Sequence, residues 1–421
     1  MTSFKTLPEG PVTLRNVTVP GCILQSPQDL IRTDLHVADG RLTDVPGKAV
    51  EMGGAMVFPC FIDMHTHLDK GHIWPRSPNP DGTFMGALTT VGRDRVARWS
   101  AGDVRRRMEF SLRCAWAHGT RAIRTHLDSL PPQDEISWPV FAEMRDLWAD
   151  RIALQASCLV AVDTIDFDGR FRRTLDLVVE HGGVLGMVTY PCADLETRLL
   201  KFLKLAEDRG LDVDFHVDET MDPTVDSLRS IAQAVIATGF PHRVTVGHCC
   251  SLSTQDDATA ARTMDLVAQA GLHVVSLPMC NLYLQDRGPG TPRRRGITLV
   301  HELKARGVNV SFASDNTRDP FYAYGDLDMI EVMRQATRIG HLDHDATDWT
   351  NAFLANPAQA CGLQPPSLAL GAPADLVICK GRDWTELFAR PQSDRIVLRA
   401  GRAIDTALPD YSDLDDLMEP A

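Results

Sequence analysis

The hydrophobic and polar positions of the first 60 residues follow a strand-like pattern. Alternating runs cover residues 12–19 and 35–38, and a further run over 41–45 follows the pair Asp39-Gly40. An Asp-Gly pair between alternating segments favours a β-hairpin, because both turn residues tolerate positive φ. The amino-terminal segment is therefore predicted to form a small β structure.

From about residue 60 the pattern changes to short apolar runs that alternate with longer segments of helical period, such as 103–118 and 196–209. Strands that alternate with helices pair in parallel, and eight such repeats over roughly 260 residues match the size of a (β/α)₈ barrel. The eight predicted strands are 60–65, 122–126, 152–160, 184–190, 213–216, 244–248, 273–277 and 308–313.

The strand pattern returns near the carboxyl end of the chain. After a predicted helix at 351–361, apolar runs cover 374–378 and 395–398. The β segments of the two chain ends can pair into one small sheet domain beside the barrel, or each can be an appendage of the barrel. The sequence predicts an α/β protein in either case.

The composition restricts the kind of protein further. The 421 residues are 44% hydrophobic and 24% charged, as in globular proteins, and 43 Lys+Arg against 56 Asp+Glu give a net charge of −13, which disfavours nucleic-acid binding. No stretch approaches the roughly 18 apolar residues of a membrane span, and the first ten residues show no secretory signal. We expect a cytoplasmic protein without a membrane or nucleic-acid partner, whose ten cysteines, lacking any Cys-x-x-Cys pair, are reduced.

A candidate metal site begins where the first barrel strand ends, at His65 and His67. Side chains two apart in a strand point the same way, so both imidazoles can reach one ion, although such pairs are also common without metal. Three further strands end in residues that bind metals or transfer protons, and the strand ends of a barrel meet at one mouth. These residues are His216, Glu219, His248 and Asp315.

Imidazole nitrogens and a carboxylate suit a divalent ion such as Zn²⁺ or Fe²⁺ with a water in an open position. Such an ion lowers the pKa of its water toward neutrality. Glu219 lies just beyond its strand, where it can exchange protons with a substrate, or where a helix N-terminus can favour its charge.

Several motifs follow one another in a fixed order. They are HTHLDK at 65–70, RTHLD at 124–128, HVDE at 216–219, His248 and SDNTRDP at 314–320. Together they resemble the amidohydrolase superfamily, and within it the cytosine deaminases and related triazine aminohydrolases. The resemblance covers nearly the whole chain. It implies a distorted (β/α)₈ TIM barrel over 59–365 and a small β-sandwich formed by the termini, 1–58 and 366–421.

The resemblance also implies roles for single residues. Glu219 would carry a proton to a ring nitrogen, His248 would orient the hydroxide or polarise the reacting centre, and Asp315 would take the proton of the water. Residues 184–194 contain no lysine to bridge a second metal, which favours one divalent ion per chain, zinc or iron with manganese also accepted. The implied metal ligands are His65, His67, His216 and Asp315.

We therefore expect a metal-dependent aminohydrolase that releases ammonia from an amino-substituted N-heterocycle related to cytosine. The alternative is hydrolysis of another C–N bond, in a cyclic amide or an alkylamino group, at the same metal site. A non-catalytic barrel is a third class, but such proteins usually lose metal ligands and this chain keeps them. The resemblance favours a homo-oligomer.

The substrate side is less determined by the sequence. The related deaminases carry a glutamine after the third strand that reads the amide edge of the ring, and residues 158–163, around Ala161, have none. Lys70 is either a solvated loop charge or a donor to the substrate edge, and the loops 74–82 and 286–296 are candidates for a lid or an oligomer contact. The residues that match expected pocket positions are Phe84, Gln285, Asn316 and Phe321.

Overall fold

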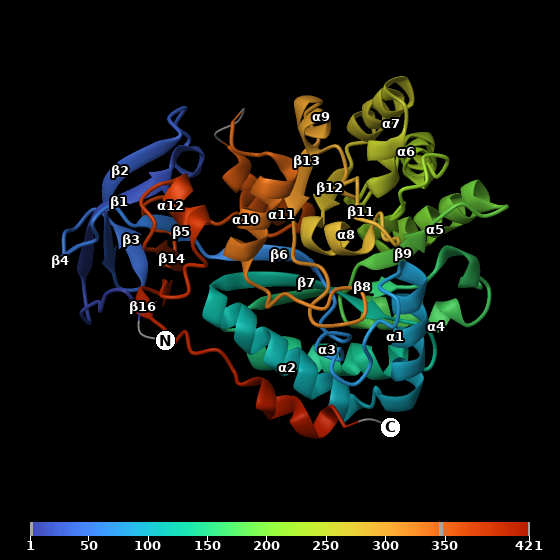
Figure 1. Ribbon diagram of the computed structural model, residues 1–421, viewed down its shortest axis with the longest axis horizontal. Helices are drawn as coiled ribbons and strands as arrows, with labels where there is room; N and C mark the ends of the chain where they lie inside the picture. The colour runs from blue at the N-terminus through green and yellow to red at the C-terminus, as the bar shows by residue number, and fades with distance from the viewer. Residues whose placement is uncertain (1–2, 345–347, 420–421) are drawn as a thin grey trace. The chain divides into compact units, whose positions relative to one another are not determined.

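The computed structural model describes residues 3–344 and 348–419 of the chain (Figure 1). These residues form two compact units. The first comprises the described parts of Met1–Asp63, Leu112–Ala122 and Leu327–Asp410; the second comprises those of Met64–Ser111, Ile123–Asp326 and Tyr411–Ala421. Among the described residues, no helix has the length and apolar character needed to span a bilayer.

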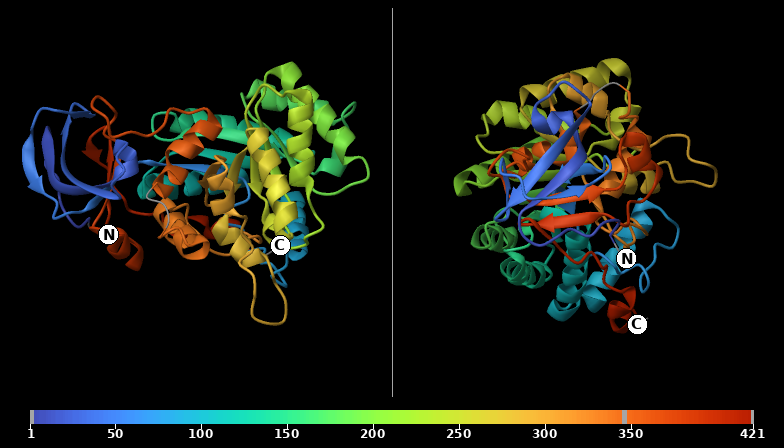
Figure 2. Two further views of the ribbon diagram at one scale, coloured as in Figure 1. Left: turned by 90° about the horizontal axis from the view of Figure 1, so that it is seen from above. Right: turned by 90° about the vertical axis from the view of Figure 1, so that its left-hand side faces the viewer.

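The first unit is built on an eight-stranded sheet that takes strands from both chain ends, drawn blue and red in Figure 2. Its order is β16-β15-β14-β5-β1-β2-β3, with β4 paired to β1, and β14 runs antiparallel to β5. The strands are β1 (Val12–Pro20), β2 (Leu30–Ala38), β3 (Arg41–Thr43), β4 (Lys48–Glu51), β5 (Met56–Pro59), β14 (Leu376–Cys379), β15 (Ile396–Arg399) and β16 (Arg402–Ala403).

The predicted hairpin at Asp39-Gly40 is confirmed. Asp39 and Gly40 have φ angles of 49° and 78° and join the antiparallel strands β2 and β3. Val12 and Leu14 alternate inward from β1, and so do Val17 and Val19 after an irregularity of the strand between Leu14 and Val17. All four are buried and share one apolar core with Leu376 of β14, so alternation marks the buried face on each side of the irregularity.

The remaining elements of the first unit are helical and lie mainly between β13 and β15 in the chain. The predicted helix at 351–361 is interrupted at Leu354, whose ψ of −82° separates a 3₁₀ turn from an α-helix. The elements are η1 (Gly21–Leu24), α10 (Met329–Gly340), η4 (Trp349–Phe353), α11 (Ala355–Cys361) and α12 (Trp384–Ala389).

All eight apolar runs are confirmed as strands, and they lie in the second unit except for the first three residues of β6 and of β7, which belong to the first. Five of them form a parallel sheet in the order β13-β12-β11-β10-β9, and β6, β7 and β8 form a second sheet. Isolated parallel bridges join Ser157 to Val184 and Thr66 to Asp315, at the outer strands of the two sheets. The strands are β6 (Phe61–Thr66), β7 (Thr120–Asp128), β8 (Ala153–Leu159), β9 (Leu185–Thr189), β10 (Val213–Val217), β11 (Val244–His248), β12 (His273–Ser276) and β13 (Asn309–Phe312).

Helices connect consecutive strands, as parallel pairing requires. Local signals set their ends: the Thr83 hydroxyl accepts a hydrogen bond from the Gly86 amide at the start of α1, and Gly210 ends α5 in the left-handed region. The elements are α1 (Phe84–Arg98), α2 (Ala101–His118), α3 (Asp134–Trp148), η2 (Val162–Thr164), α4 (Phe171–Glu180), α5 (Leu195–Arg209), α6 (Ser227–Thr238), η3 (Cys250–Thr254), α7 (Asp257–Gln269), α8 (Pro278–Leu284), α9 (Val300–Ala305) and η5 (Tyr411–Leu417).

A buried ion pair fastens α10 to the segment before β15 within the first unit. Both guanidinium Nη atoms of Arg395 reach the carboxylate of Asp328, at 2.6 and 2.5 Å, and Asp328 also accepts a hydrogen bond from the Ile330 amide. Burial raises the pKa of Asp328, but the guanidinium outweighs it and holds this pKa well below its ordinary value. The pair therefore stabilises the fold only while Asp328 is ionised.

Breaking this pair should destabilise the first unit. We expect Arg395→Met to lower the free energy of unfolding by about 3–5 kcal/mol at pH 7, because the buried carboxylate of Asp328 then keeps only His118, 3.7 Å away, as an ionic neighbour. Since the pKa of Asp328 is depressed by folding, the difference between the variant and the parent should shrink as the pH falls below about 4. Urea denaturation followed by circular dichroism measures both effects. The control is Arg382→Met, which removes an exposed partner of Glu386 and should leave the midpoint unchanged; equal losses in the two variants would contradict the account.

Candidate active site

The predicted metal ligands and His248 all lie where strands of the second unit end. His65 is the last residue but one of β6, and His67 follows that strand. His216 lies near the end of β10, His248 is the last residue of β11, and Asp315 follows β13. Strand ends on one edge bring side chains together that are up to 250 positions apart in the chain.

Four of these side chains converge on one point. The distance from His216 Nε2 to His65 Nε2 is 3.1 Å, and to His67 Nε2 it is 3.4 Å. Asp315 Oδ1 lies 3.2 Å from His67 Nε2 and 3.6 Å from His65 Nε2. All four side chains are buried. The predicted ligand set is thus assembled as one cluster from three parts of the chain.

The cluster fits a divalent metal ion. Ligand atoms placed tetrahedrally about 2.0–2.2 Å from an ion are about 3.3–3.6 Å apart, close to the spacings observed here. Burial, more than any neighbouring charge, lowers the pKa of His65, His67 and His216 well below its ordinary value, so the rings are neutral and can offer lone pairs. Three imidazoles and one carboxylate form a donor set that zinc, iron and manganese all accept.

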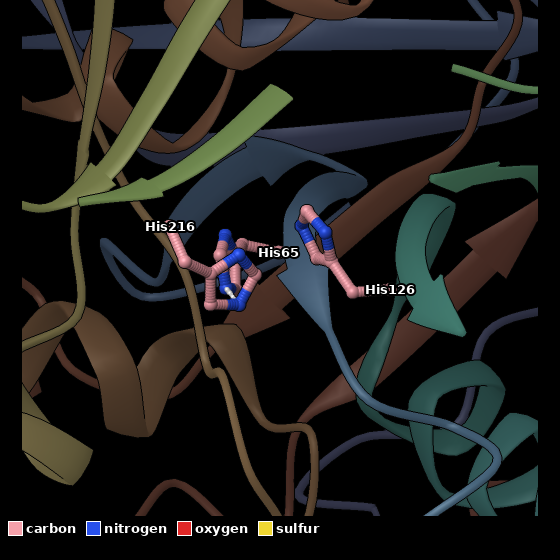
Figure 3. Close-up of side chains that lie close together, drawn as sticks. All are labelled: His65, His126 and His216. Atoms are coloured by element: carbon pink, nitrogen blue, oxygen red, sulfur yellow. Dashed lines mark hydrogen bonds between the residues drawn. The ribbon is translucent and has the colours of Figure 1, made fainter. Parts of the chain in front are cut away.

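A fifth residue, His126 at the end of β7, lies beside the cluster and was not predicted as a site residue (Figure 3). Its ring centroid is 4.0 Å from that of His65 and 4.6 Å from that of His216. Neither ring nitrogen has a hydrogen-bond partner among the described residues, and Asp214 Oδ2 is 4.0 Å from Nε2. In the sets His65/His126/His216 and His65/His67/Asp315 alike, the ligand atoms lie within 4.8 Å of one another. His67 and Asp315 are the proposed ligands because each lies within 3.6 Å of another ligand atom of the cluster.

Glu219 is the centre of a second group of polar contacts. Its Oε1 accepts a hydrogen bond from Asn281 Nδ2 at 3.2 Å and lies 3.4 Å from His248 Nδ1, and Gln285 Nε2 donates to its backbone oxygen. Burial, followed by the charge of Asp315, raises the pKa of Glu219 well above its ordinary value. The carboxyl group therefore holds its proton more readily than an exposed glutamate does.

Two residues differ from their expected place at this carboxylate. Asn281 was not predicted to act in the site, yet its amide contacts both Glu219 and His248 Nδ1, the latter at 3.0 Å. The only sequence signal was its place in α8 directly after β12, at a strand end like the others. Gln285, expected at the pocket, instead supports the Glu219 backbone.

The two groups face a pocket of about 410 Å³. Phe84 and Phe321 lie on its wall with ring centroids 5.5 Å apart, and Asn316 also lines it, as the sequence predicts. At the stretch that lacks the glutamine, Ala161 contributes only a methyl group. The apolar part of the wall consists of Phe84, Leu88, Val91, Leu130, Leu159, Val160, Ala161, Val188 and Phe321.

Comparison with known proteins agrees with this geometry. A family model described as "Amidohydrolase family" matches residues 173–404. A curated pterin deaminase from Rhizobium rhizogenes (strain K84 / ATCC BAA-868) is 54% identical over 416 residues, 96% of this chain and 95% of that relative. This identity, over almost the whole length of both chains, indicates one family.

Two solved structures share the fold. A 5-methylcytosine deaminase from Klebsiella pneumoniae, liganded with 5-fluorocytosine, has a TM-score of 0.78 and 23% identity, covering 95% of this chain and 98% of its own. An N-isopropylammelide isopropylaminohydrolase from Burkholderia multivorans ATCC 17616 has a TM-score of 0.72 and 23% identity, covering 95% and 100%. The predicted resemblance is confirmed: the chain belongs to the amidohydrolase family and is a hydrolase that acts on carbon–nitrogen bonds.

Proposed function

We propose that this protein is a metal-dependent deaminase that converts a 2-amino-4-oxopteridine, a pterin, into the 2,4-dioxo compound and ammonia. The observation that carries the proposal is the 54% identity to a pterin deaminase over 96% of the chain. A pterin is still a ring related to cytosine, as the sequence predicts, but it is a narrower class of substrate. In both rings the amino-bearing carbon, a ring nitrogen and a carbonyl carbon follow one another along one edge.

The pocket supports a bicyclic ring. A volume of about 410 Å³ lies within the range of small-molecule sites, and most of its wall is apolar. One side of the pocket is lined by Leu159, Val160 and Ala161. A glutamine at this place would occupy part of the pocket and would require a polar partner. The faces and the C–H edge of a fused pyrazine ring can pack against this apolar side.

One divalent ion would be held by the four converging residues at the strand ends. When bound, it would lower the pKa of a water molecule and so supply a nucleophile at neutral pH. Asp315 would accept the proton of that water, and His248, whose Nδ1 faces Asn281 and Glu219, would orient it. The proposed ligands are His65, His67, His216 and Asp315.

Glu219 would move a proton onto the heterocycle. Its raised pKa keeps a proton available at Oε, and the hydrogen bond from Asn281 fixes the direction of the carboxyl group. Protonation of N1, the pterin ring nitrogen beside the amino-bearing carbon that has a free lone pair, favours attack of water at that carbon. Glu219 would supply this proton from the pocket wall, and the proton that Asp315 accepts from the water would pass to the amino group and let ammonia leave.

The wider organisation is proposed on the same basis. The bridges at Ser157 and Thr66 support closure of β6 to β13 into one distorted (β/α)₈ barrel within 59–365, with 1–58 and 366–421 forming the terminal β domain. Assembly into a homo-oligomer and a cytoplasmic location stay predictions.

Replacing the proposed proton carrier should stop the reaction. We expect Glu219→Gln to lower kcat for pterin by at least about 100-fold, because the amide keeps the shape of the side chain but transfers no proton. Ammonia release and the ultraviolet spectrum of the pteridine measure this at equal metal content. The control is Asp222→Asn, an exposed carboxylate three positions later, which should retain the parental rate. Full activity of a folded Glu219→Gln protein would rule out its role.

Removing a proposed ligand should remove the metal. We expect His216→Ala to bind well below one divalent ion per chain, since it loses the nitrogen that lies within 3.4 Å of both His65 and His67. Elemental analysis after dialysis measures this directly, without relying on activity. His344→Ala, which alters a histidine with 85% of its side chain exposed, should keep one ion. Retention of a full ion by His216→Ala would show that the site lies elsewhere.

A further inference from the structure

Lys70 is a buried cation in the pocket that has no role in the chemistry described so far. It follows β6 closely, only 4% of the residue is exposed, and it lines the same cavity as Glu219 and His216. Of the two alternatives that the sequence left open, the solvated loop charge is wrong. A lysine is seldom buried without a partner, so its surroundings need an explanation.

A chain of ionic contacts fixes the ammonium group. Lys70 Nζ lies 3.0 Å from Asp128 Oδ1, and Arg95 Nη1 donates to the other carboxylate oxygen of Asp128 at 2.9 Å. The Asp128 backbone amide donates to Asp69 Oδ2, also at 2.9 Å. The Asp128 carboxylate therefore cannot turn away from Lys70 without also breaking its contact with Arg95, while Asp69 holds the Asp128 backbone in place.

The ammonium group stays charged in this setting. Burial alone lowers the pKa of Lys70, but Asp128, Asp319 and Asp69 raise it, and the net pKa lies above its ordinary value. Nζ also lies 5.1 Å from the centre of the Phe321 ring, within the range of a cation–π contact. The charge is thus stabilised from one side by carboxylates and from another by an aromatic wall of the pocket.

The ammonium group has hydrogen-bonding capacity left over. A lysine offers three N–H donors and no acceptor, and Asp128 takes one of them. Among residues 3–344 and 348–419, Nζ has no second oxygen or nitrogen partner. The remaining donors belong to a group that lines the cavity, so a ligand with an acceptor can meet them.

We propose that Lys70 Nζ donates a hydrogen bond to the 4-oxo oxygen of the substrate and thereby selects 2-amino-4-oxo rings over 2,4-diamino rings. This inference rests on the proposed function. It gives Lys70 the task of recognising the carbonyl group, in a pocket whose wall around Ala161 carries no glutamine.

The chemistry of the ring edge leads to this assignment. In a pterin, N3 lies between the carbon that loses the amino group and the carbon that bears the oxo group. With the first carbon at the metal ligands and N1, the neighbouring nitrogen with a free lone pair, at Glu219, N3–H and then the oxo oxygen follow on the other side of that carbon, and the oxo oxygen is the acceptor on that side. An ammonium group can only donate hydrogen bonds, so it pairs favourably with an oxo oxygen. With an amino group at the same position, two donors would face each other and no hydrogen bond would form. A site that hydrogen-bonds one group rejects the analogue that lacks it.

The test compares the binding of two ligands. Dissociation constants of pterin and 2,4-diaminopteridine are measured by the intrinsic fluorescence of the pteridines, using metal-loaded protein in the Glu219→Gln background so that turnover is slow compared with the measurement. We expect the parent to prefer pterin, and Lys70→Met to weaken pterin binding about 10- to 100-fold while leaving the diamino compound unchanged or tighter. Lys70→Arg, which keeps charge and donors, should restore most of the preference.

A purely structural role for Lys70 gives a different pattern. If the ammonium group only neutralises Asp128, Lys70→Met weakens both ligands equally and the preference survives, which overturns the proposal. Should Lys70→Met fail to fold, the double variant Lys70→Met/Asp128→Asn removes both charges together and carries the same comparison. Failure of the parent to release ammonia from pterin would instead refute the proposed function, so the two results are distinguishable.

Discussion

The convergence of three imidazole nitrogens and one carboxylate oxygen within 3.6 Å, in a fully buried setting, is the constraint on which the rest of the site depends. Such a cluster is costly to bury unless a cation compensates it. It also requires β6, β10 and β13 to keep their register. The strands end at one edge, so each contributes one or two side chains to the same point.

The other polar residues around this point form two groups. Glu219, His248 and Asn281 contact one another and are suited to proton transfer. Lys70, held by Asp128, is suited to recognising a carbonyl oxygen. The pocket wall near Ala161 is apolar. The site can therefore hydrogen-bond to one edge of a ring, while the other side of the ring makes only packing contacts. A bicyclic heterocycle with one amino-oxo edge meets these conditions.

Much of this arrangement was predictable from the sequence because it rests on local periodicity. Asp39-Gly40 specifies a hairpin by its turn chemistry, and the apolar runs predict all eight strands of the second unit together with the histidines at their ends. His126 and Asn281 were missed as site residues, because a buried polar residue near a strand end looks the same whether or not it faces the site. The burial of Lys70 depends on Asp128 and Arg95, which are distant in sequence, so no local pattern indicated it.

The central claim is that the protein deaminates a pterin at this site for one divalent ion. The most direct test is to load the protein with one divalent ion per chain, add pterin, and measure ammonia together with the pteridine product by mass spectrometry. The account predicts one ammonia for each 2,4-dioxopteridine formed, with no activity after the ion is removed. Full metal occupancy without ammonia, or a ring-opened product, would contradict it.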